Sequence, residues 1–161
     1  VLKGALSSIF HDVNYVNAPF LAKQRGIEIK IIKSEAPSSY TSLLKVKMIT
    51  DIEENNVSVS LIAKNIARVV KLNDYDVIIK PNEHILIVPH INQIAMVAKV
   101  ANALCEDNIN IGSMNVSQNI KGSEMSIMAI DIDSALSEEM LGKISKIDGV
   151  HNPKYIKLTV L

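Results

Sequence analysis

The chain has 161 residues, 48% of them hydrophobic, and its 17 basic and 17 acidic side chains give a formal net charge of zero. This balance lacks the positive excess that binding to a phosphate backbone requires, so we expect no nucleic-acid partner. The single cysteine, Cys105, excludes an internal disulfide framework and a metal site built from several cysteines of this chain.

The single cysteine predicts a reducing, cytoplasmic setting, and hydropathy predicts no membrane contact. No apolar run approaches the roughly 20 residues that span a bilayer, and the first residues lack the basic start and long apolar stretch of a signal peptide. The sequence opens on Val1 without an initiator Met, so we expect a piece of a longer protein. With no Trp and many Ile, Val and Leu, its core should be aliphatic and rich in strands.

Two short helices are predicted at the start. Apolar residues at positions 2, 6, 9 and 10 have helical spacing. Residues 17–25 form the second helix, with Asn17 as its cap, Pro19 in its first turn and Gly26 at its end.

Period-two alternation then predicts strands. Ile27, Ile29 and Ile31 alternate with charged residues, which indicates a half-buried strand. Further strands are predicted around residues 45–48, 57–61, 69–72 and 76–80, with a polar turn at 53–56 and another at 73–74. The polar break at 80–83 sets a domain boundary between residues 82 and 83.

The second domain, residues 83–161, alternates strands and helices in the order βαββαβ. Strands are predicted at 85–90, 109–116, 125–132 and 155–160, and helices at 96–105 and from the cap Ser137 to the stop at Gly149. This order is typical of the ferredoxin-like plait, so the fold class is α+β, with two helices covering one sheet face. The other face and the sheet edges need a partner, so we expect the chain to dimerise.

Catalytic motifs are absent from the sequence. It contains no Gly-rich phosphate loop, no G-x-S-x-G, no H-E-x-x-H and no Cys-x-x-Cys, and its four His residues lack metal-ligand spacing. We therefore assign no catalytic residue and no metal site. Cys105 is interpreted as a small buried thiol on the apolar face of helix 96–105, together with positions 97, 100, 101 and 104.

Three polar residues form the candidate ligand site: His90 and Asn92, where the first plait strand meets its helix, and Asn110, at the start of the next strand. We expect the end of the first strand and the start of the second to lie close together. Asn amides and free helix N–H groups suit an amino-acid ligand. The alternative is loop solvation and local turn capping.

Several stretches resemble bacterial phosphoglycerate dehydrogenases. Residues 87–92 (IVPHIN), 107–114 (DNINIGSM) and 147–150 (IDGV) resemble their ACT domain. Residues 1–4 (VLKG), 13–19 (VNYVNAP) and 22–27 (AKQRGI) resemble their intervening, or allosteric substrate-binding, domain. The resemblance covers essentially the whole chain, with the intervening domain in residues 1–82 and the ACT domain in 83–161.

The resemblance implies the regulatory region of an enzyme that oxidises 3-phosphoglycerate with NAD in serine biosynthesis, with the catalytic domains elsewhere. In that family L-serine inhibits by binding between paired ACT domains of a homodimer or tetramer, and the positions that hold it correspond to His90, Asn92 and Asn110. This sequence departs at Gln93-Ile94-Ala95, where the family has Arg-Pro-Gly. That change would loosen or reshape the site, so an ACT domain that does not sense serine is the alternative.

Arg68 and Lys80 match positions that are basic in some family members and linked to anion or substrate binding. Both lie near predicted strand ends, where they can hold a phosphate. The alternative is a pair of solvated surface charges.

Other families share parts of this pattern. The β subunit of iron–sulfur L-serine dehydratase carries a related fold before an ACT domain, but its Ser-Ser-Ser-His-Thr motif is absent here. An ACT-type transcriptional regulator would need a basic helix-turn-helix, which the sequence lacks. A dimerisation module without a ligand remains an alternative that only binding data separate.

Overall fold

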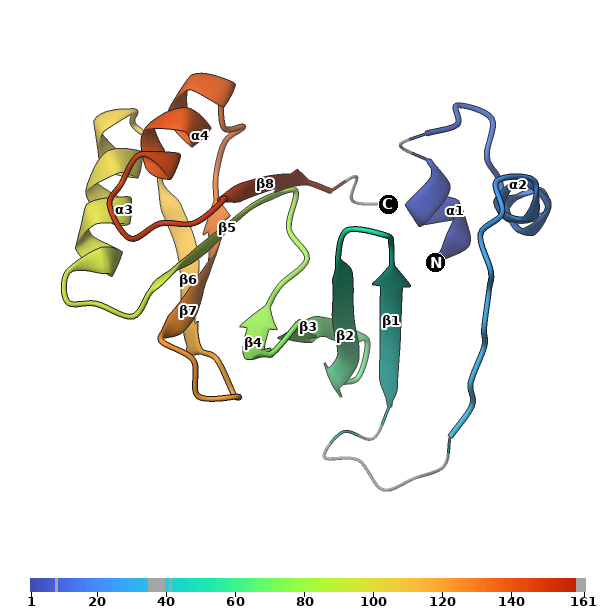
Figure 1. Cartoon of the computed structure of the whole chain (residues 1–161). Coiled ribbons are helices and arrows are strands. Elements are labelled where there is room, and N and C mark those ends of the chain that lie inside the picture. The colour runs from blue at the N-terminus through green and yellow to red at the C-terminus, as the bar shows by residue number, and fades with distance from the viewer. Residues whose placement is uncertain (8, 35–39, 41, 159–161) are drawn as a thin grey trace. The chain divides into compact units, whose positions relative to one another are not determined.

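The computed structural model describes residues 1–7, 9–34, 40 and 42–158 of the chain (Figure 1). Its internal contacts form two compact units, residues 1–38 and residues 39–161. The domain boundary between residues 82 and 83 stays a prediction.

The first unit contains the two predicted helices, α1 (Leu2–Leu6) and α2 (Ala18–Gln24). Their small core consists of Leu6, Val13, Ala18 and Ala22. Gly26 follows α2 with a φ of +69°, which confirms the predicted stop. Asn17 stands at the cap position, but its Oδ1 accepts from the backbone N–H of Asn14 at 2.8 Å and not from a helix amide.

The strand predicted at residues 27–31 is wrong. Residues 27–34 belong to no helix or strand, and Ile27, Ile29 and Ile31 are exposed. Alternation indicates which side chains would share a face of a strand. A strand also needs a neighbouring strand to hydrogen-bond with. Among the described residues, no strand pairs with residues 27–31.

A four-stranded antiparallel sheet opens the second unit, with the order β1-β2-β3-β4. Its strands are β1 (Leu43–Ile49), β2 (Glu54–Ala63), β3 (Ile66–Leu72) and β4 (Tyr75–Ile79), which confirms the four strands predicted for this segment. The first turn lies at residues 50–53, earlier than predicted, where the N–H of Thr50 donates to the carbonyl of Glu53. Asn73, with a φ of +50°, forms the predicted turn between β3 and β4.

The predicted βαββαβ order is confirmed in the rest of the chain. It consists of β5 (His84–Ile91), α3 (Met96–Glu106), β6 (Ile111–Gln118), β7 (Met125–Ile132), α4 (Glu138–Ser145) and β8 (Lys154–Lys157). The sheet order β6-β7-β5-β8 is that of the ferredoxin-like fold and is consistent with an ACT domain. The last predicted strand residues, 159 and 160, lie outside the described part.

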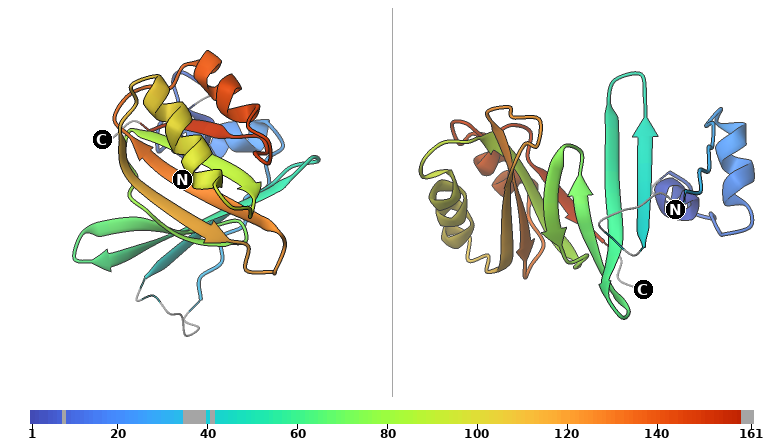
Figure 2. Two further views of the ribbon diagram at one scale, coloured as in Figure 1. Left: turned by 90° about the vertical axis from the view of Figure 1, so that its left-hand side faces the viewer. Right: turned by 90° about the horizontal axis from the view of Figure 1, so that it is seen from below.

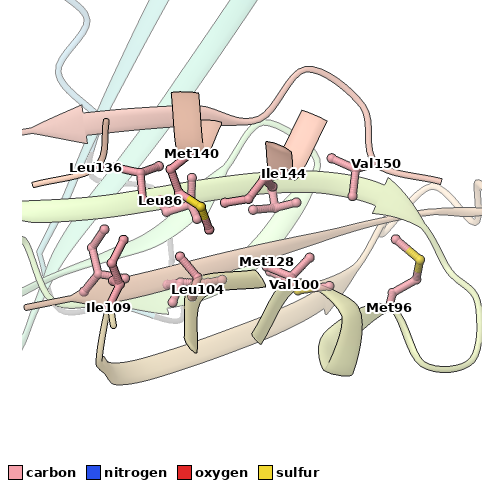
Figure 3. Close-up of a cluster of buried hydrophobic side chains, with 13 residues drawn as sticks. Leu86, Met96, Val100, Leu104, Ile109, Met128, Leu136, Met140, Ile144 and Val150 are labelled. Carbon is pink, nitrogen blue, oxygen red and sulfur yellow. The ribbon is translucent and has the colours of Figure 1, made fainter. Parts of the chain in front are cut away.

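The main core lies between this sheet and α3 and α4 (Figure 3). Helix α3 contributes Met96, Val100 and Leu104, a row with a spacing of four residues. Cys105 lies beside this row and is exposed, so its predicted burial is wrong. Ser137 caps α4 as predicted, because its Oγ accepts from the N–H of Met140 at 3.1 Å.

The other face of the second sheet is covered by the same chain (Figure 2). A second core cluster unites Val77 and Ile79 of β4 with residues of β5 and β7, namely Ile85, Ile87, Ile127 and Ala129. The prediction that this face needs a partner is therefore wrong, because strand β4 already buries it.

Polar contacts also join the two sheets, at the tip of the β6–β7 hairpin. The N–H of Ile120 donates to the carbonyl of Asp74 at 2.9 Å, and the ammonium of Lys121 lies 2.8 Å from the Asp74 carboxylate. This hydrogen bond and the charge of Asp74 raise the pKa of Lys121 above its ordinary value. The two sheets therefore share both an apolar core and a polar contact.

None of the helices in the described residues has the length and apolar character needed to cross a membrane.

Candidate functional site

His90 lies near the end of β5, where it is buried with 2% of its surface exposed. Its Nδ1 is 2.8 Å from the carbonyl of Ile91. A carbonyl only accepts, so Nδ1 carries a hydrogen and donates it to this oxygen. Nε2 is buried and has no hydrogen-bond partner among the described residues.

Asn92 and the start of α3 follow His90 directly. The N–H of Asn92 donates to the carbonyl of Glu124 at 2.7 Å, and its side chain is exposed. Helix α3 has no side-chain cap, and its N-cap residue Ala95 is left-handed with a φ of +68°. The family that the sequence resembles has Gly at this position. Ala95 therefore adopts a left-handed backbone conformation that Gly favours and Ala disfavours.

Asn110 lies at the opposite end of the sheet from His90. Because β5 and β6 both run antiparallel to β7, they are parallel to each other, and Ser126 of β7 pairs with His90 on one side and Gln118 on the other. Asn110 precedes Gln118 by eight residues (118 − 110), which is roughly 26 Å along a strand. The expectation that Asn110 lies near His90 within one chain is wrong.

Sequence reasoning missed Ser126, the cross-strand partner of His90. Ser126 is 0% exposed, and its Oγ also has no hydrogen-bond partner in the described part of the chain. The helix-facing pairs of β5 and β7 run Leu86 with Ile130, Val88 with Met128, and finally His90 with Ser126. A polar pair therefore closes an otherwise apolar row. Because β7 buries apolar residues on both faces, alternation in the sequence alone does not single out Ser126.

Arg68 and Lys80 occupy level backbone positions in the first sheet. Ile79 pairs with Val69, so Lys80, one residue beyond the ladder, is level with Arg68. An Arg68 guanidinium nitrogen donates to the carbonyl of Ala67 at 2.8 Å. Ser60 of β2 pairs with Arg68 of β3. Ser60 also lines a shallow pocket of about 260 Å³, together with Ser42, Leu43, Leu44, Val59 and Leu61.

Metal-ligating groups do not gather in the described part of the chain. No set of three or more His, Cys, Asp or Glu side chains lies close enough there to hold a metal ion.

Comparison with known proteins gives two kinds of match. Residues 1–73 match the family of the D-3-phosphoglycerate dehydrogenase intervening domain. A D-3-phosphoglycerate dehydrogenase of Synechocystis sp. is 29% identical over 158 residues, covering 98% of this chain and 28% of that protein. The enzyme of Methanocaldococcus jannaschii is 30% identical over 158 residues, covering 98% of this chain and 30% of that protein.

A relative with a different name also matches. The probable L-serine dehydratase β chain of Bacillus subtilis is 23% identical over 150 residues, which cover 93% of this chain and 68% of that protein. The chain thus spans less than a third of the two dehydrogenases but about two thirds of the dehydratase chain.

Proposed function

Since this chain is homologous over 98% of its length to D-3-phosphoglycerate dehydrogenases and contains their intervening domain, we propose that it is a regulatory region that binds L-serine. In this proposal residues 1–82 form the intervening domain and residues 83–161 the ACT domain. The βαββαβ fold of the second part supports it.

The catalytic chemistry belongs to parts of the parent enzyme outside these residues. The chain has no Gly-rich loop to hold a dinucleotide phosphate, so NAD does not fit here and would bind elsewhere in the parent. What this chain contributes is ligand binding and self-association in a cytoplasmic enzyme of serine biosynthesis, with serine as the feedback inhibitor.

The serine site needs two copies of the chain. His90 and Asn92 lie at one end of the sheet and Asn110 at the other, so a single chain cannot place all three on one small molecule. A two-fold pairing that brings the end of β5 in one copy beside the start of β6 in the other unites them. Serine would then stabilise the paired arrangement, and this difference in affinity between arrangements is what allows regulation.

Arg68 and Lys80 form a second proposed site, for an anion such as a phosphate group of a substrate. The observations that support it are their level backbone positions in the first sheet and the pairing of Arg68 with Ser60, a residue that lines a pocket.

A second candidate function is the β chain of an L-serine dehydratase. The observation behind it is the match over 150 residues, which cover 68% of the Bacillus subtilis β chain. The lower identity and the absence of a Ser-Ser-Ser-His-Thr motif count against it. Co-purification with an iron–sulfur subunit would select the dehydratase, and attachment to a dinucleotide-binding domain would select the dehydrogenase.

Isothermal titration calorimetry of the chain with L-serine tests the proposal, with D-serine and glycine as ligand controls. We expect saturable heat with L-serine only, and its loss in Asn92→Ala. Asn102→Ala, an exposed asparagine on α3, is the matched control and should bind like the wild type. No heat at millimolar L-serine would leave an ACT domain that serves assembly alone.

A further inference from the structure

Strand β1 forms one edge of the first sheet. The order β1-β2-β3-β4 gives it a neighbour on one side, and no strand of the described residues pairs with its other side. Such an edge presents backbone N–H and C=O groups to which another extended segment can add. Every residue of β1 is exposed except Val46, which is half-buried. The edge is therefore accessible along its whole length.

An apolar pocket lies where β1 begins. Three of the residues that line it are leucines with much of their surface exposed, Leu43 at 46%, Leu44 at 54% and Leu61 at 50%. Exposed apolar surface beside a free strand edge favours an occupant that brings both a backbone and apolar side chains.

Residues 28–33 have the properties of such an occupant. Ile29 and Ile31 alternate with Glu28 and Lys30, and all four are exposed. In the single chain these residues belong to no strand, and their backbone groups form no hydrogen bond with other residues that the structure describes. The chain thus contains a segment with the pattern of a strand and a sheet edge without a neighbour.

Charge favours one antiparallel register between the segment and the edge. With Ile29 opposite Leu44, Glu28 lies opposite Lys45, and opposite charges in directly facing positions stabilise a pair of strands. In the same register Ile31 faces Ser42, so both isoleucines lie beside residues that line the apolar pocket. The electrostatic and the apolar arguments therefore select the same register.

Other pairings of β1 bring like charges together. A register two residues further along β1 would set Lys30 opposite Lys45. Pairing of β1 with β1 of another copy, centred on Val46, would set Lys45 opposite Lys47. Like charges in directly facing positions are destabilising, so both pairings are disfavoured.

We propose that residues 28–31 of one copy add to the β1 edge of a second copy, antiparallel and with Ile29 opposite Leu44. A second copy is the occupant because the single chain leaves both the segment and the edge unpaired. Two-fold symmetry makes the exchange reciprocal, so each copy supplies one segment and receives another. This inference is independent of the proposed serine site.

Disulfide cross-linking of the full chain tests the exchange. Ile29→Cys and Leu44→Cys are each made in a chain whose exposed Cys105 is replaced by Ser, and the two variants are refolded together under oxidising conditions. Facing residues of antiparallel strands have Cα atoms about 4.5 to 5.5 Å apart, a separation that a disulfide bridges. We expect a covalent dimer with one copy of each variant.

The matched control keeps the strand and changes the position. Ile49→Cys is 69% exposed at the other end of β1, roughly 17 Å from Leu44 along the strand. Mixed with Ile29→Cys, it should give no covalent dimer above background. Adding Glu28→Lys to the Ile29→Cys chain should lower the dimer yield with Leu44→Cys about 3-fold, because it replaces an opposite-charge pair with a like-charge pair.

Three results would overturn the inference. One is the absence of covalent dimer when Ile29→Cys and Leu44→Cys are mixed, and another is equal dimer with Ile49→Cys. The third is a single chain carrying both Ile29→Cys and Leu44→Cys that closes the disulfide as a monomer, since the segment would then pair with its own β1. If Leu44→Cys does not fold, Ile31→Cys with Ser42→Cys, the next facing pair of exposed residues, decides in the same way.

Discussion

Ile78 and Ile79 are neighbours on β4 with opposite surroundings, 64% and 8% exposed respectively. Ile79→Ala removes three carbon atoms from the cluster between the two sheets. At about 0.8 kcal/mol per buried carbon the transfer term is about 2.4 kcal/mol, and the cavity left behind raises the expected loss in unfolding free energy to about 3 kcal/mol. Ile78→Ala removes the same atoms from the surface and should change it by less than about 0.5 kcal/mol.

Urea denaturation followed by far-UV circular dichroism is the assay, because the chain has no Trp to report by fluorescence. Circular dichroism reports on both sheets, and we expect Ile79→Ala to lower the midpoint of one common transition. Equal losses in the two variants would refute the reasoning, since they would mean that β4 does not bury Ile79 between the sheets.

Three further changes have defined outcomes. Ala95→Gly should raise the unfolding free energy by about 0.5 kcal/mol, because relief of the left-handed strain outweighs the added chain entropy; an unchanged urea midpoint would contradict this. Ser137→Ala should cost about 1 kcal/mol in the same assay through loss of the α4 cap. Asp74→Asn should return the raised pKa of Lys121 towards its ordinary value of 10.5 in an NMR titration. A lysine whose pKa is raised by folding stabilises the folded state fully below pH 10.5, and this stabilisation is lost as the pH rises through the raised pKa. The stability of Asp74→Asn should therefore not show this decrease at alkaline pH.

The sequence was sufficient for the elements whose signal is local. Short apolar segments identified β5 and β7, and Ser137 with Gly149 marked the ends of the segment that contains α4. From these elements the βαββαβ order followed directly. Such features depend on a few neighbouring residues, so a single sequence contains them.

The failures concern partners that lie far away in the sequence. Ile27, Ile29 and Ile31 alternate like a strand, but a pattern cannot show whether a second backbone is within reach. Cys105 was wrongly predicted to be buried because it follows Leu104, the last buried residue of α3, by one position.

The candidate site was only partly predictable for the same reason. His90 and Asn92 were found from their neighbours in the sequence, and their position at the end of β5 is as expected. The distance to Asn110 depends on β5 and β6 being parallel, which the predicted ferredoxin-like order already implies, so this error came from not applying the predicted fold to the site. Ser126 became visible only when the ladder placed it opposite His90.

Mixing two inactive variants tests the two-copy serine site most directly. Asn92→Ala and Asn110→Ala should each abolish L-serine binding in titration calorimetry. In an equimolar mixture refolded together, about half of the two-fold pairs contain one copy of each variant, and one of their two sites is intact, so about a quarter of the wild-type capacity should return. Capacity that stays at zero in the mixture, while the two variants pair normally, would contradict a site shared between copies.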